Sequence, residues 1–316
     1  MSLIAILEDL NVEKDKLEEL KKPFIEKGHQ FKEFNKTTDE DTLIQQLQGV
    51  DVAILANMPL SDRIIQQAND LKYIDVAFTG VDHIGLQACK QKGIHVSNAS
   101  GYSNEAVAEL AIGMAITLLR NIREVEQRCR NHGTKDGLVG TEIKGKTVGI
   151  IGMGKIGSRS AELFHAFGAN ILSPEGHHHA QNLSYIQYAS EEELYQKSDI
   201  VVLHCPLNDS TRGMVNQTKL SMMKSSAILI NLARGPVVNT DDLIEALNIG
   251  VIAGAGLDVF DTEPPLSNDL PIMHAKNTLL TPHIAYASKE AMITRAEIVF
   301  NNLKDWFDGK VSNQIL

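Results

Sequence analysis

The stretch from Lys146 to Gly157 constrains the fold most, because it has the pattern of a strand, a tight turn and a helix start. Residues 147–151 form a short run rich in β-branched side chains, which is typical of a buried parallel strand. Three glycines follow with the spacing G-x-G-x-x-G, namely Gly152, Gly154 and Gly157. In such a turn the first glycine allows the reversal, the second exposes bare backbone to a pyrophosphate, and the third lets helix and strand approach closely. The stretch therefore predicts a dinucleotide site at a helix N-terminus.

An acidic residue after the next strand indicates which dinucleotide binds. The apolar strand expected at 170–173 is followed by Glu175. A carboxylate about 20 residues past the glycine motif accepts hydrogen bonds from the ribose hydroxyls of NAD and repels the 2′-phosphate of NADP. We therefore expect NAD as the cofactor. The alternative, a glycine-rich connector without a ligand, does not explain why strand, turn, helix and acid follow one another in this order.

Length, charge and cysteine content limit the class of protein. A chain of 316 residues with 43% hydrophobic residues suggests about two domains, each with its own core. The net charge of −10 argues against nucleic acid or an anionic membrane surface as the main partner. We expect neither a signal peptide nor a membrane span. Three widely spaced cysteines, Cys89, Cys129 and Cys205, favour a reducing, cytoplasmic location over a disulfide framework or a zinc site.

Strands alternate with helices along the first 100 residues, which predicts a parallel sheet covered on both faces. Ser61 is placed to cap one of these helices. A long helical pattern at 103–130 should lead into a second domain, and the last helix, 289–308, should cross back onto the first. The predicted domains are therefore 1–100 with 286–316, and 101–285. The expected elements of the first domain are strands at 3–8, 50–55, 73–78 and 94–96 and helices at 12–27 and 39–48.

The second domain is expected to be a doubly wound sheet of six strands, in which ligands bind beyond the carboxyl ends of the strands. Polar and titratable residues follow several of these strands. They are Glu175, His204-Cys205-Pro206, residues 231–234, residues 258–263 and Pro282-His283. The sequence therefore predicts a site along this edge of the sheet.

Three of these residues suit the reduction of a 2-keto acid. The fork of Arg234 can hold a carboxylate and a carbonyl oxygen together, although an arginine in a surface ion pair is the alternative. His283 can give or take a proton, although most histidines merely pack or cap. A carboxylate at Glu263 would favour the imidazolium form of His283, although alone it would be an ordinary loop acid. Together they polarise a carbonyl, supply a proton and hold a carboxylate, as nicotinamide chemistry requires.

The first domain is expected to close over the substrate and exclude water. Its contribution would be the turn at 78–82, where backbone N–H groups can hold a carboxylate. The segment Asn57-Met58-Pro59 is expected to shape the pocket for the substituent at C3 of the substrate.

Four motifs in order resemble those of the D-isomer-specific 2-hydroxyacid dehydrogenases, and the resemblance covers nearly the whole chain. It implies an α/β fold with two doubly wound parallel-sheet domains, a Rossmann NAD-binding domain and a flavodoxin-like substrate domain with a cleft between them. It also implies a homodimer joined through the nucleotide domain, with 103–130 as the interface. The motifs are Gly152-x-Gly154-x-x-Gly157, Asn231-x-Ala233-Arg234-Gly235, Asp258-Val259-Phe260-x-x-Glu263-Pro264 and Thr281-Pro282-His283-Ile284-Ala285.

The same resemblance implies the roles of individual residues. Arg234, Glu263 and His283 would form the catalytic set, with no metal ion. Thr79 and Gly80 would bind the substrate carboxylate together with Arg234. The remaining predicted contacts line NAD, and they are Gly152, Gly154, Lys155, Ile156, Gly157, Glu175, Cys205, Pro206, Leu232, Ala233 and Asp258.

Some features depart from the family pattern or leave alternatives open. Glu175 stands where the family usually has aspartate, so NADP remains an alternative cofactor. His177-His178-His179 is either an exposed loop or a metal-binding segment. The residues around His283 resemble those of glycerate and hydroxypyruvate enzymes. One alternative function is an NAD(H)-sensing, corepressor-like protein without turnover. Another is a different nicotinamide enzyme on this scaffold, such as a formate or phosphonate dehydrogenase, although formate enzymes carry glutamine where this chain has Glu263.

Overall fold

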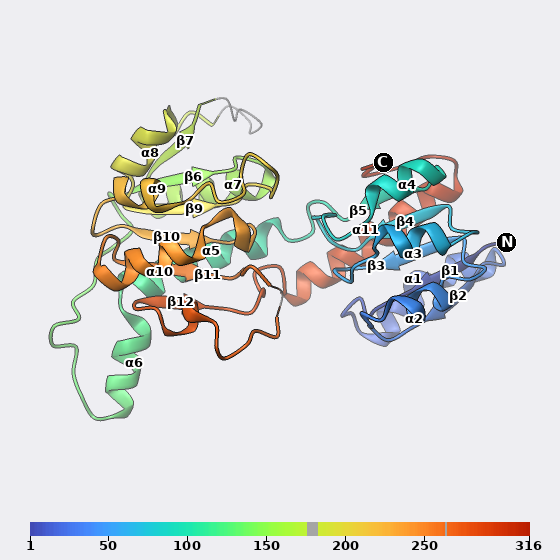
Figure 1. Cartoon of the computed structure of the whole chain (residues 1–316), viewed down its shortest axis with the longest axis horizontal. Helices are drawn as coiled ribbons and strands as arrows, with labels where there is room; N and C mark the ends of the chain where they lie inside the picture. The colour runs from blue at the N-terminus through green and yellow to red at the C-terminus, as the bar shows by residue number, and fades with distance from the viewer. Residues whose placement is uncertain (176–182, 263) are drawn as a thin grey trace. The chain divides into compact units, whose positions relative to one another are not determined.

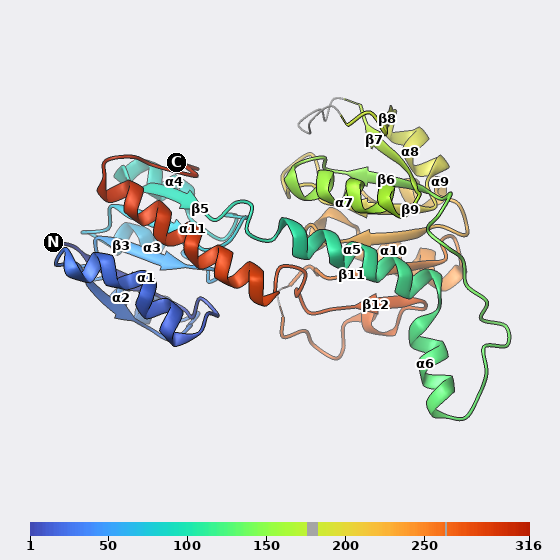
Figure 2. The same cartoon turned by 180° about the vertical axis from the view of Figure 1, so that it is seen from behind.

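The computed structural model describes residues 1–175, 183–262 and 264–316. The chain forms two compact units, the first made of 1–103 and 287–316 and the second of 104–286. Each unit has a parallel sheet with helices on both faces (Figure 1 and Figure 2). The prediction of two doubly wound α/β domains is therefore confirmed. No helix in the described ranges is long and apolar enough to cross a bilayer.

The first unit is built on a five-stranded sheet with the order β2-β1-β3-β4-β5, and each pair of neighbours is parallel. This is the strand order of flavodoxin-like folds. Helices α1 and α11 contact each other on one face, while α2, α3 and α4 follow one another on the other (Figure 2). Its elements are β1 (Leu3–Ile6), α1 (Lys14–Glu26), β2 (Gln30–Glu33), α2 (Glu40–Gln46), β3 (Val52–Leu55), α3 (Asp62–Gln67), β4 (Tyr73–Val76), α4 (Leu86–Lys92), β5 (His95–Asn98) and α11 (Lys289–Phe307).

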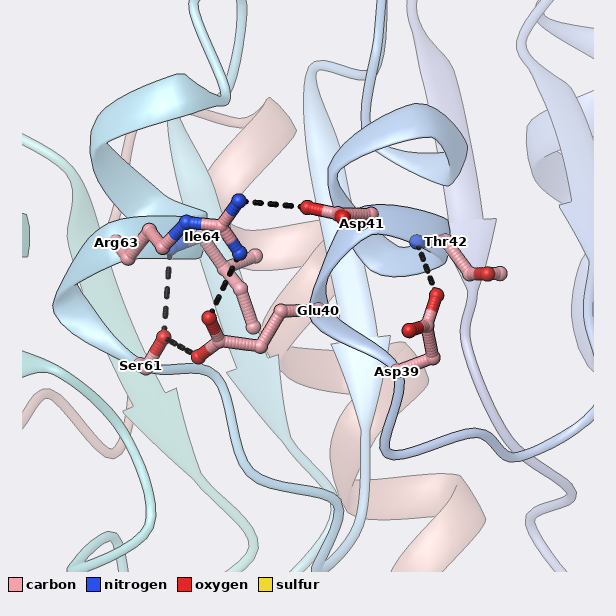
Figure 3. A network of polar contacts seen from close by, with 7 residues as sticks. All are labelled: Asp39, Glu40, Asp41, Thr42, Ser61, Arg63 and Ile64. Carbon is pink, nitrogen blue, oxygen red and sulfur yellow. Dashed lines mark hydrogen bonds and ion pairs between the residues drawn. The ribbon is translucent and has the colours of Figure 1, made fainter.

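Side-chain caps and an ion-pair network join α2 to α3 on the surface of the first unit. Asp39 caps α2 by accepting from the backbone N–H of Thr42 at 2.8 Å. Ser61 caps α3, as predicted, and its hydroxyl also donates to Glu40. Arg63 donates to Glu40 at 2.9 Å and to Asp41 at 2.6 Å (Figure 3). These side chains are largely solvent-exposed, so the network orients the two helices more than it stabilises them.

Helix α11 completes the core of the first unit. Arg295 is 1% exposed and donates from Nη2 to the carbonyl oxygen of Leu10 at 2.7 Å. Asn302 is equally buried, and its Nδ2 donates to Asp75 at 3.1 Å and to the carbonyl oxygen of Asn98 at 3.0 Å. Burial raises the pKa of Asp75 well above its usual range, although the hydrogen bond from Asn302 opposes this shift. A segment more than 180 residues away in the sequence is thus needed to fill the core around β4 and β5.

The second unit is built on a seven-stranded sheet with the order β12-β11-β10-β9-β6-β7-β8. Counted from β6, this is the Rossmann order extended by one strand. Helices α5 and α7 cover one face, with a core that includes Met114 and Phe164, and α8, α9 and α10 cover the other, with Tyr195 and Leu243. Its elements are α5 (Asn104–Leu119), α6 (Ile122–Arg130), β6 (Thr147–Ile151), α7 (Lys155–Ala166), β7 (Asn170–Pro174), β8 (Ile186–Ala189), α8 (Glu191–Lys197), β9 (Ile200–Leu203), α9 (Gln217–Met222), β10 (Ile228–Asn231), the 3-10 helix η1 (Gly235–Val237), α10 (Thr240–Ile249), β11 (Gly254–Leu257), the 3-10 helix η2 (Pro271–His274) and β12 (Thr278–Leu280).

Three sequence-based expectations about these elements were wrong. The edge strands β2 and β8 were missed, because β2 has no buried residue and β8 buries only its two ends. The long helix expected at 103–130 is two helices, α5 and α6. Asn121 lies between them with a left-handed φ of 51°, a conformation that asparagine adopts more readily than most residues. The helical pattern continues through this position, so periodicity alone does not reveal the break.

Candidate active site

The turn between β6 and α7 shows why glycine occurs three times. Gly152 has a φ of 102°, and a Cβ there would lie 2.5 Å from the backbone nitrogen of Cys205. A Cβ on Gly157 would lie 2.1 Å from the carbonyl oxygen of Gly152. At Gly154, in contrast, no described residue beyond its neighbours in the chain has an atom within 4 Å of the position a Cβ would take. The fold itself requires the first and third glycines, and the second leaves open space beside bare backbone.

Helix α7 begins beside this open space. Gly154 is its N-cap, and its carbonyl oxygen accepts the first helical hydrogen bond, from the N–H of Ser158 at 2.9 Å. The preceding N–H groups, including those of Lys155 and Ile156, have no helical acceptor because they lie in the first turn. Such groups bind phosphate oxygens well, since the helix dipole also favours negative charge there. The turn thus fits the pyrophosphate of a dinucleotide.

A partly buried histidine ties this turn to the neighbouring strand. His204 directly follows β9, and its N–H donates to the carbonyl oxygen of Ile151 at 2.8 Å. Its ring Nε2 lies 2.8 Å from the hydroxyl oxygen of Ser160 on α7. Burial lowers the pKa of His204 to about 4, so the ring is neutral at physiological pH. His204 was expected at this edge as one of the residues that follow strands, but its partner Ser160 was missed, although a serine three residues after Gly157 lies on the same face of α7.

Backbone hydrogen bonds continue from strand to strand just beyond the sheet. The N–H of Leu232 donates to the carbonyl oxygen of Leu203 at 3.4 Å, and that of Asp258 donates to Asn231 at 3.1 Å. The N–H of His283 then donates to the carbonyl oxygen of Asp258 at 2.8 Å. These bonds place the segments that follow β9, β10, β11 and β12 side by side at one edge. The described residues that were predicted to act after these four strands are therefore brought to one edge.

The segment after β10 fixes the backbone around Arg234. Asn231 donates from Nδ2 to the carbonyl oxygen of Arg234 at 2.9 Å and accepts from the N–H of Ala233 at 3.0 Å. Arg234 is half-buried, and its Nη1 donates to the carbonyl oxygen of Ala233 at 2.9 Å. A Cβ on Gly235 would lie 1.9 Å from the backbone of Phe260, so this segment contacts the segment after β11. The arginine is thus held between two strand ends.

Asp258 organises the loop that carries His283. Its Oδ1 accepts from the hydroxyl of Thr281 at 2.6 Å and from the N–H of Ile284 at 2.8 Å, and its Oδ2 accepts from the N–H of Ala285 at 2.8 Å. Burial raises the pKa of Asp258, and these hydrogen bonds oppose the shift. His283 has a left-handed φ of 55°. Such a conformation costs about 1–3 kcal/mol and persists only where the surroundings impose it, as Asp258 does here.

The other predicted site residues fall into three groups. Glu175 is exposed directly after β7, and Cys205 is buried beside Pro206, so that burial raises the pKa of its thiol to about 11. Thr79 and Gly80 belong to the first unit, where the carbonyl oxygen of Thr79 accepts from Asn98 Nδ2 at 2.7 Å. Glu263 and His177-His178-His179 lie outside the described residues. Among the residues that are described, no three His, Cys, Asp or Glu side chains gather as a metal site.

Comparison with known proteins supports an assignment to one family. Residues 112–285 match the family model described as D-isomer specific 2-hydroxyacid dehydrogenase, NAD binding domain. A hydroxypyruvate reductase of Blautia hydrogenotrophica is 31% identical over 286 residues, which is 88% of each chain. A glyoxylate reductase of Aeropyrum pernix is 36% identical over 266 residues, 80% of this chain and 79% of that protein. Among solved structures, an acyclic imino acid reductase in complex with NADPH and D-Arg superposes with a TM-score of 0.90 at 30% identity, over 100% of both chains.

Proposed function

Since the chain belongs to the family of D-isomer-specific 2-hydroxyacid dehydrogenases, and is an NAD-dependent oxidoreductase of that class, we propose that it interconverts a small 2-keto acid and its D-2-hydroxy acid. The substrate is of the hydroxypyruvate, glyoxylate and pyruvate class, which agrees with relatives described as hydroxypyruvate reductase and glyoxylate reductase. One observation carries the proposal. The hydrogen bonds beyond the sheet hold the segments of Arg234 and His283 on either side of Asp258, at the edge that also has the glycine turn.

The cofactor is held by the second unit. The N–H groups of Lys155 and Ile156, beside the open space at Gly154, bind its pyrophosphate, and Glu175 accepts from the adenosine ribose. The other residues proposed to line NAD are Gly152, Gly157, Cys205, Pro206, Leu232 and Ala233. Asp258 was predicted among them, but its carboxylate is buried and engaged by residues 281–285, so we assign it to positioning His283.

Arg234, His283 and Glu263 are proposed to bind the substrate and to transfer the proton. When bound, NADH supplies a hydride to the carbonyl carbon of the keto acid. Arg234 donates to the substrate carboxylate and to the carbonyl oxygen, which stabilises the negative charge that develops there. His283 donates a proton to that oxygen, so that the products are the hydroxy acid and NAD, and in the reverse direction it accepts the proton. Glu263 is proposed to stabilise the protonated imidazole of His283.

Thr79 and Gly80 remain our proposed contacts for the substrate carboxylate. They directly follow Phe78 beyond β4, and Asn98 fixes the carbonyl oxygen of Thr79. Successive backbone amides form anion-binding turns, so the N–H groups of these two residues are suited to a carboxylate. A cytoplasmic location likewise remains a prediction from the cysteine content.

The first test is NADH oxidation at 340 nm with pyruvate, glyoxylate, hydroxypyruvate, 2-ketoisocaproate and phosphohydroxypyruvate, each repeated with NADPH. We expect turnover with NADH and at least one of the first three acids. Activity with NADPH alone would contradict the role given to Glu175. NADH binding without turnover on any acid would refute the proposal and favour the NAD(H)-sensing alternative.

Two variants test the catalytic roles, each with a matched control. His283→Ala is expected to lower kcat at least 100-fold, because general acid–base catalysis typically contributes about 10²–10⁴. His132→Ala is its control, since His132 is an exposed histidine that also has a left-handed φ, of 57°. Arg234→Ala is expected to raise KM and lower kcat. Its control is Arg212→Ala, at an exposed arginine, which should change neither constant. Near-normal kcat in His283→Ala across pH would show that another group transfers the proton.

We also propose that the protein is a homodimer joined through α5 and α6. Helix α6 has no buried side chain within the described structure, and Ile122 and Val139 nearby are 43% and 78% exposed. They line a groove of about 1360 Å³ that also includes residues 277–280 of the second unit. A second copy would cover these apolar side chains. Size-exclusion chromatography with light scattering should give a dimer, and Ile122→Glu with Val139→Asp should give a monomer. Ile249→Glu, at an exposed isoleucine of α10, is the control.

A further inference from the structure

The first unit has a polar cluster at the carboxyl edge of its sheet, made of Glu8, Lys36 and Asn57. These residues follow β1, β2 and β3. Glu8 is 6% exposed, and its Oε1 accepts from the N–H groups of Ala56 and Met58, each at 2.8 Å. Lys36 Nζ lies 3.3 Å from Glu8 Oε2 and donates to Asn57 Oδ1 at 2.5 Å. A buried carboxylate thus anchors both the lysine and the segment that follows β3.

This cluster differs from an ordinary surface ion pair. The side chain of Lys36 is 49% exposed, while its carboxylate partner is almost wholly buried. An ammonium group has three N–H donors, and in the described structure two of them are directed at Glu8 and Asn57. The group is therefore fixed on the protein side and accessible on the other. Lys72 forms a comparable 2.6 Å ion pair with Asp51, but both residues precede their strands and so lie at the opposite edge of the sheet.

The cluster lies beside the segment proposed to bind the substrate carboxylate. The N–H of Ala77 donates to the carbonyl oxygen of Leu55 at 2.6 Å, which aligns the ends of β3 and β4. Further along, the N–H of Leu60 donates to His83 at 3.0 Å, and that of Gly85 donates to Leu60 at 2.8 Å. The segment 56–60 therefore runs alongside the segment 77–85, which contains Thr79 and Gly80. If Thr79 and Gly80 bind the carboxylate of the substrate, a substituent on C3 would project toward a neighbouring segment of this edge, such as 56–60.

We propose that Lys36, positioned by Glu8 and Asn57, selects the C3 substituent of the substrate and favours a neutral hydroxyl group, as in hydroxypyruvate. This inference rests on the function proposed above. The ammonium donates to the hydroxyl oxygen, and the amide oxygen of Asn57 is placed to accept the hydroxyl hydrogen. The methyl group of pyruvate offers no such partner. A phosphate would bring about −1.5 to −2 charges to a lysine whose charge Glu8 already balances, so phosphohydroxypyruvate is disfavoured.

The test compares kcat/KM for hydroxypyruvate with that for glyoxylate, which has no C3 atom, in the wild type and in Lys36→Met. Methionine keeps much of the length of the side chain and removes the donor. A hydrogen bond to a charged group corresponds to roughly a 10- to 150-fold effect, so the hydroxypyruvate-to-glyoxylate ratio should fall at least tenfold. Because Lys36→Met alone leaves Glu8 buried without its cation, Glu8→Gln combined with Lys36→Met serves as a second variant. Lys72→Met is the control and should keep the wild-type ratio.

The outcomes separate this inference from the proposed function. Turnover of several 2-keto acids with an unchanged ratio in both Lys36 variants would overturn the inference and leave the proposed function standing. A wild type that prefers pyruvate or phosphohydroxypyruvate to hydroxypyruvate would also overturn it. Absence of turnover on every keto acid would refute the proposed function, and the inference with it.

Discussion

Alanine at Gly154 and alanine at Gly157 should impair different properties, NADH binding and stability respectively, although both replace a glycine of one turn. Gly154 has a φ of −73°, which any residue adopts, and no described residue beyond its neighbours in the chain has an atom within 4 Å of a Cβ placed there. A Cβ on Gly157 would lie 2.1 Å from the carbonyl oxygen of Gly152, whereas ordinary contacts begin at 3.4 Å. We therefore expect Gly154→Ala to fold normally and bind NADH poorly, and Gly157→Ala to fold less stably.

The magnitudes follow from these contacts. In Gly154→Ala, the smaller entropy of the unfolded chain stabilises by about 0.4–1 kcal/mol and the poorer N-cap costs a similar amount, so stability should change little. Its methyl group occupies the space left for the pyrophosphate, and loss of one charge-assisted hydrogen bond, about 1.5–3 kcal/mol, weakens NADH binding about 10- to 150-fold. In Gly157→Ala the helix must retreat from Gly152, and such overpacking costs about 1–3 kcal/mol.

Calorimetry of the protein without cofactor and fluorescence titration with NADH measure the two effects separately. For a unit of this size, each kcal/mol lowers the Tm by about 2–4 °C, so Gly157→Ala should unfold clearly below the wild type. Gly154→Ala should match the wild type in Tm and not in Kd. Wild-type affinity for NADH in Gly154→Ala would refute the placement of the pyrophosphate against this backbone.

Three further perturbations test other parts of the structure. Asp258→Ala should lower kcat about 100-fold in steady-state assays, because the loop that carries His283 loses its hydrogen-bond acceptors and a shift of about 1 Å has such an effect. A normal kcat would show that the loop keeps its conformation without Asp258. Burial raises the pKa of Asp75, so the folded state retains a proton that the unfolded state releases, and stability falls as pH rises above about 4. In urea unfolding, the free energy of unfolding of Asp75→Asn should therefore rise relative to that of the wild type between pH 4 and pH 8. A difference between the two proteins that does not change with pH would contradict this. Arg63→Ala should change the urea midpoint only slightly, and less in 1 M salt, since its ion pairs are exposed.

Sequence patterns were sufficient to predict features that depend on local chemistry or on the common direction of the strands in a parallel sheet. The glycine turn combines a strand, a helix start and three steric requirements within one short segment. The strand-end residues could be predicted because every strand of a parallel sheet points the same way, so Arg234 and His283 had to reach one edge. These features need no knowledge of which strands are neighbours.

Features that depend on distant partners could not be predicted in this way. The role of Asp258 requires β11 and β12 to be adjacent, and the pair of His204 and Ser160 requires α7 to lie beside β9. Glu8, Lys36 and Asn57 come from three separate strand ends, and nothing in their spacing marks them as a group. The break at Asn121 depends on one backbone conformation within a continuous helical pattern.

The discontinuous first unit has a consequence for the order in which the molecule is made. On the ribosome, its strands are synthesised first, but α11 emerges only after the whole of 104–286. At about 5–20 residues per second this interval lasts roughly 10–40 s, during which the apolar face that receives Phe300 and Leu303 has no cover. The second unit is contiguous and can fold within that time. The first unit is therefore the last part of this chain to become native, although its strands are made before the second unit, and it is the part that a chaperone would have to protect.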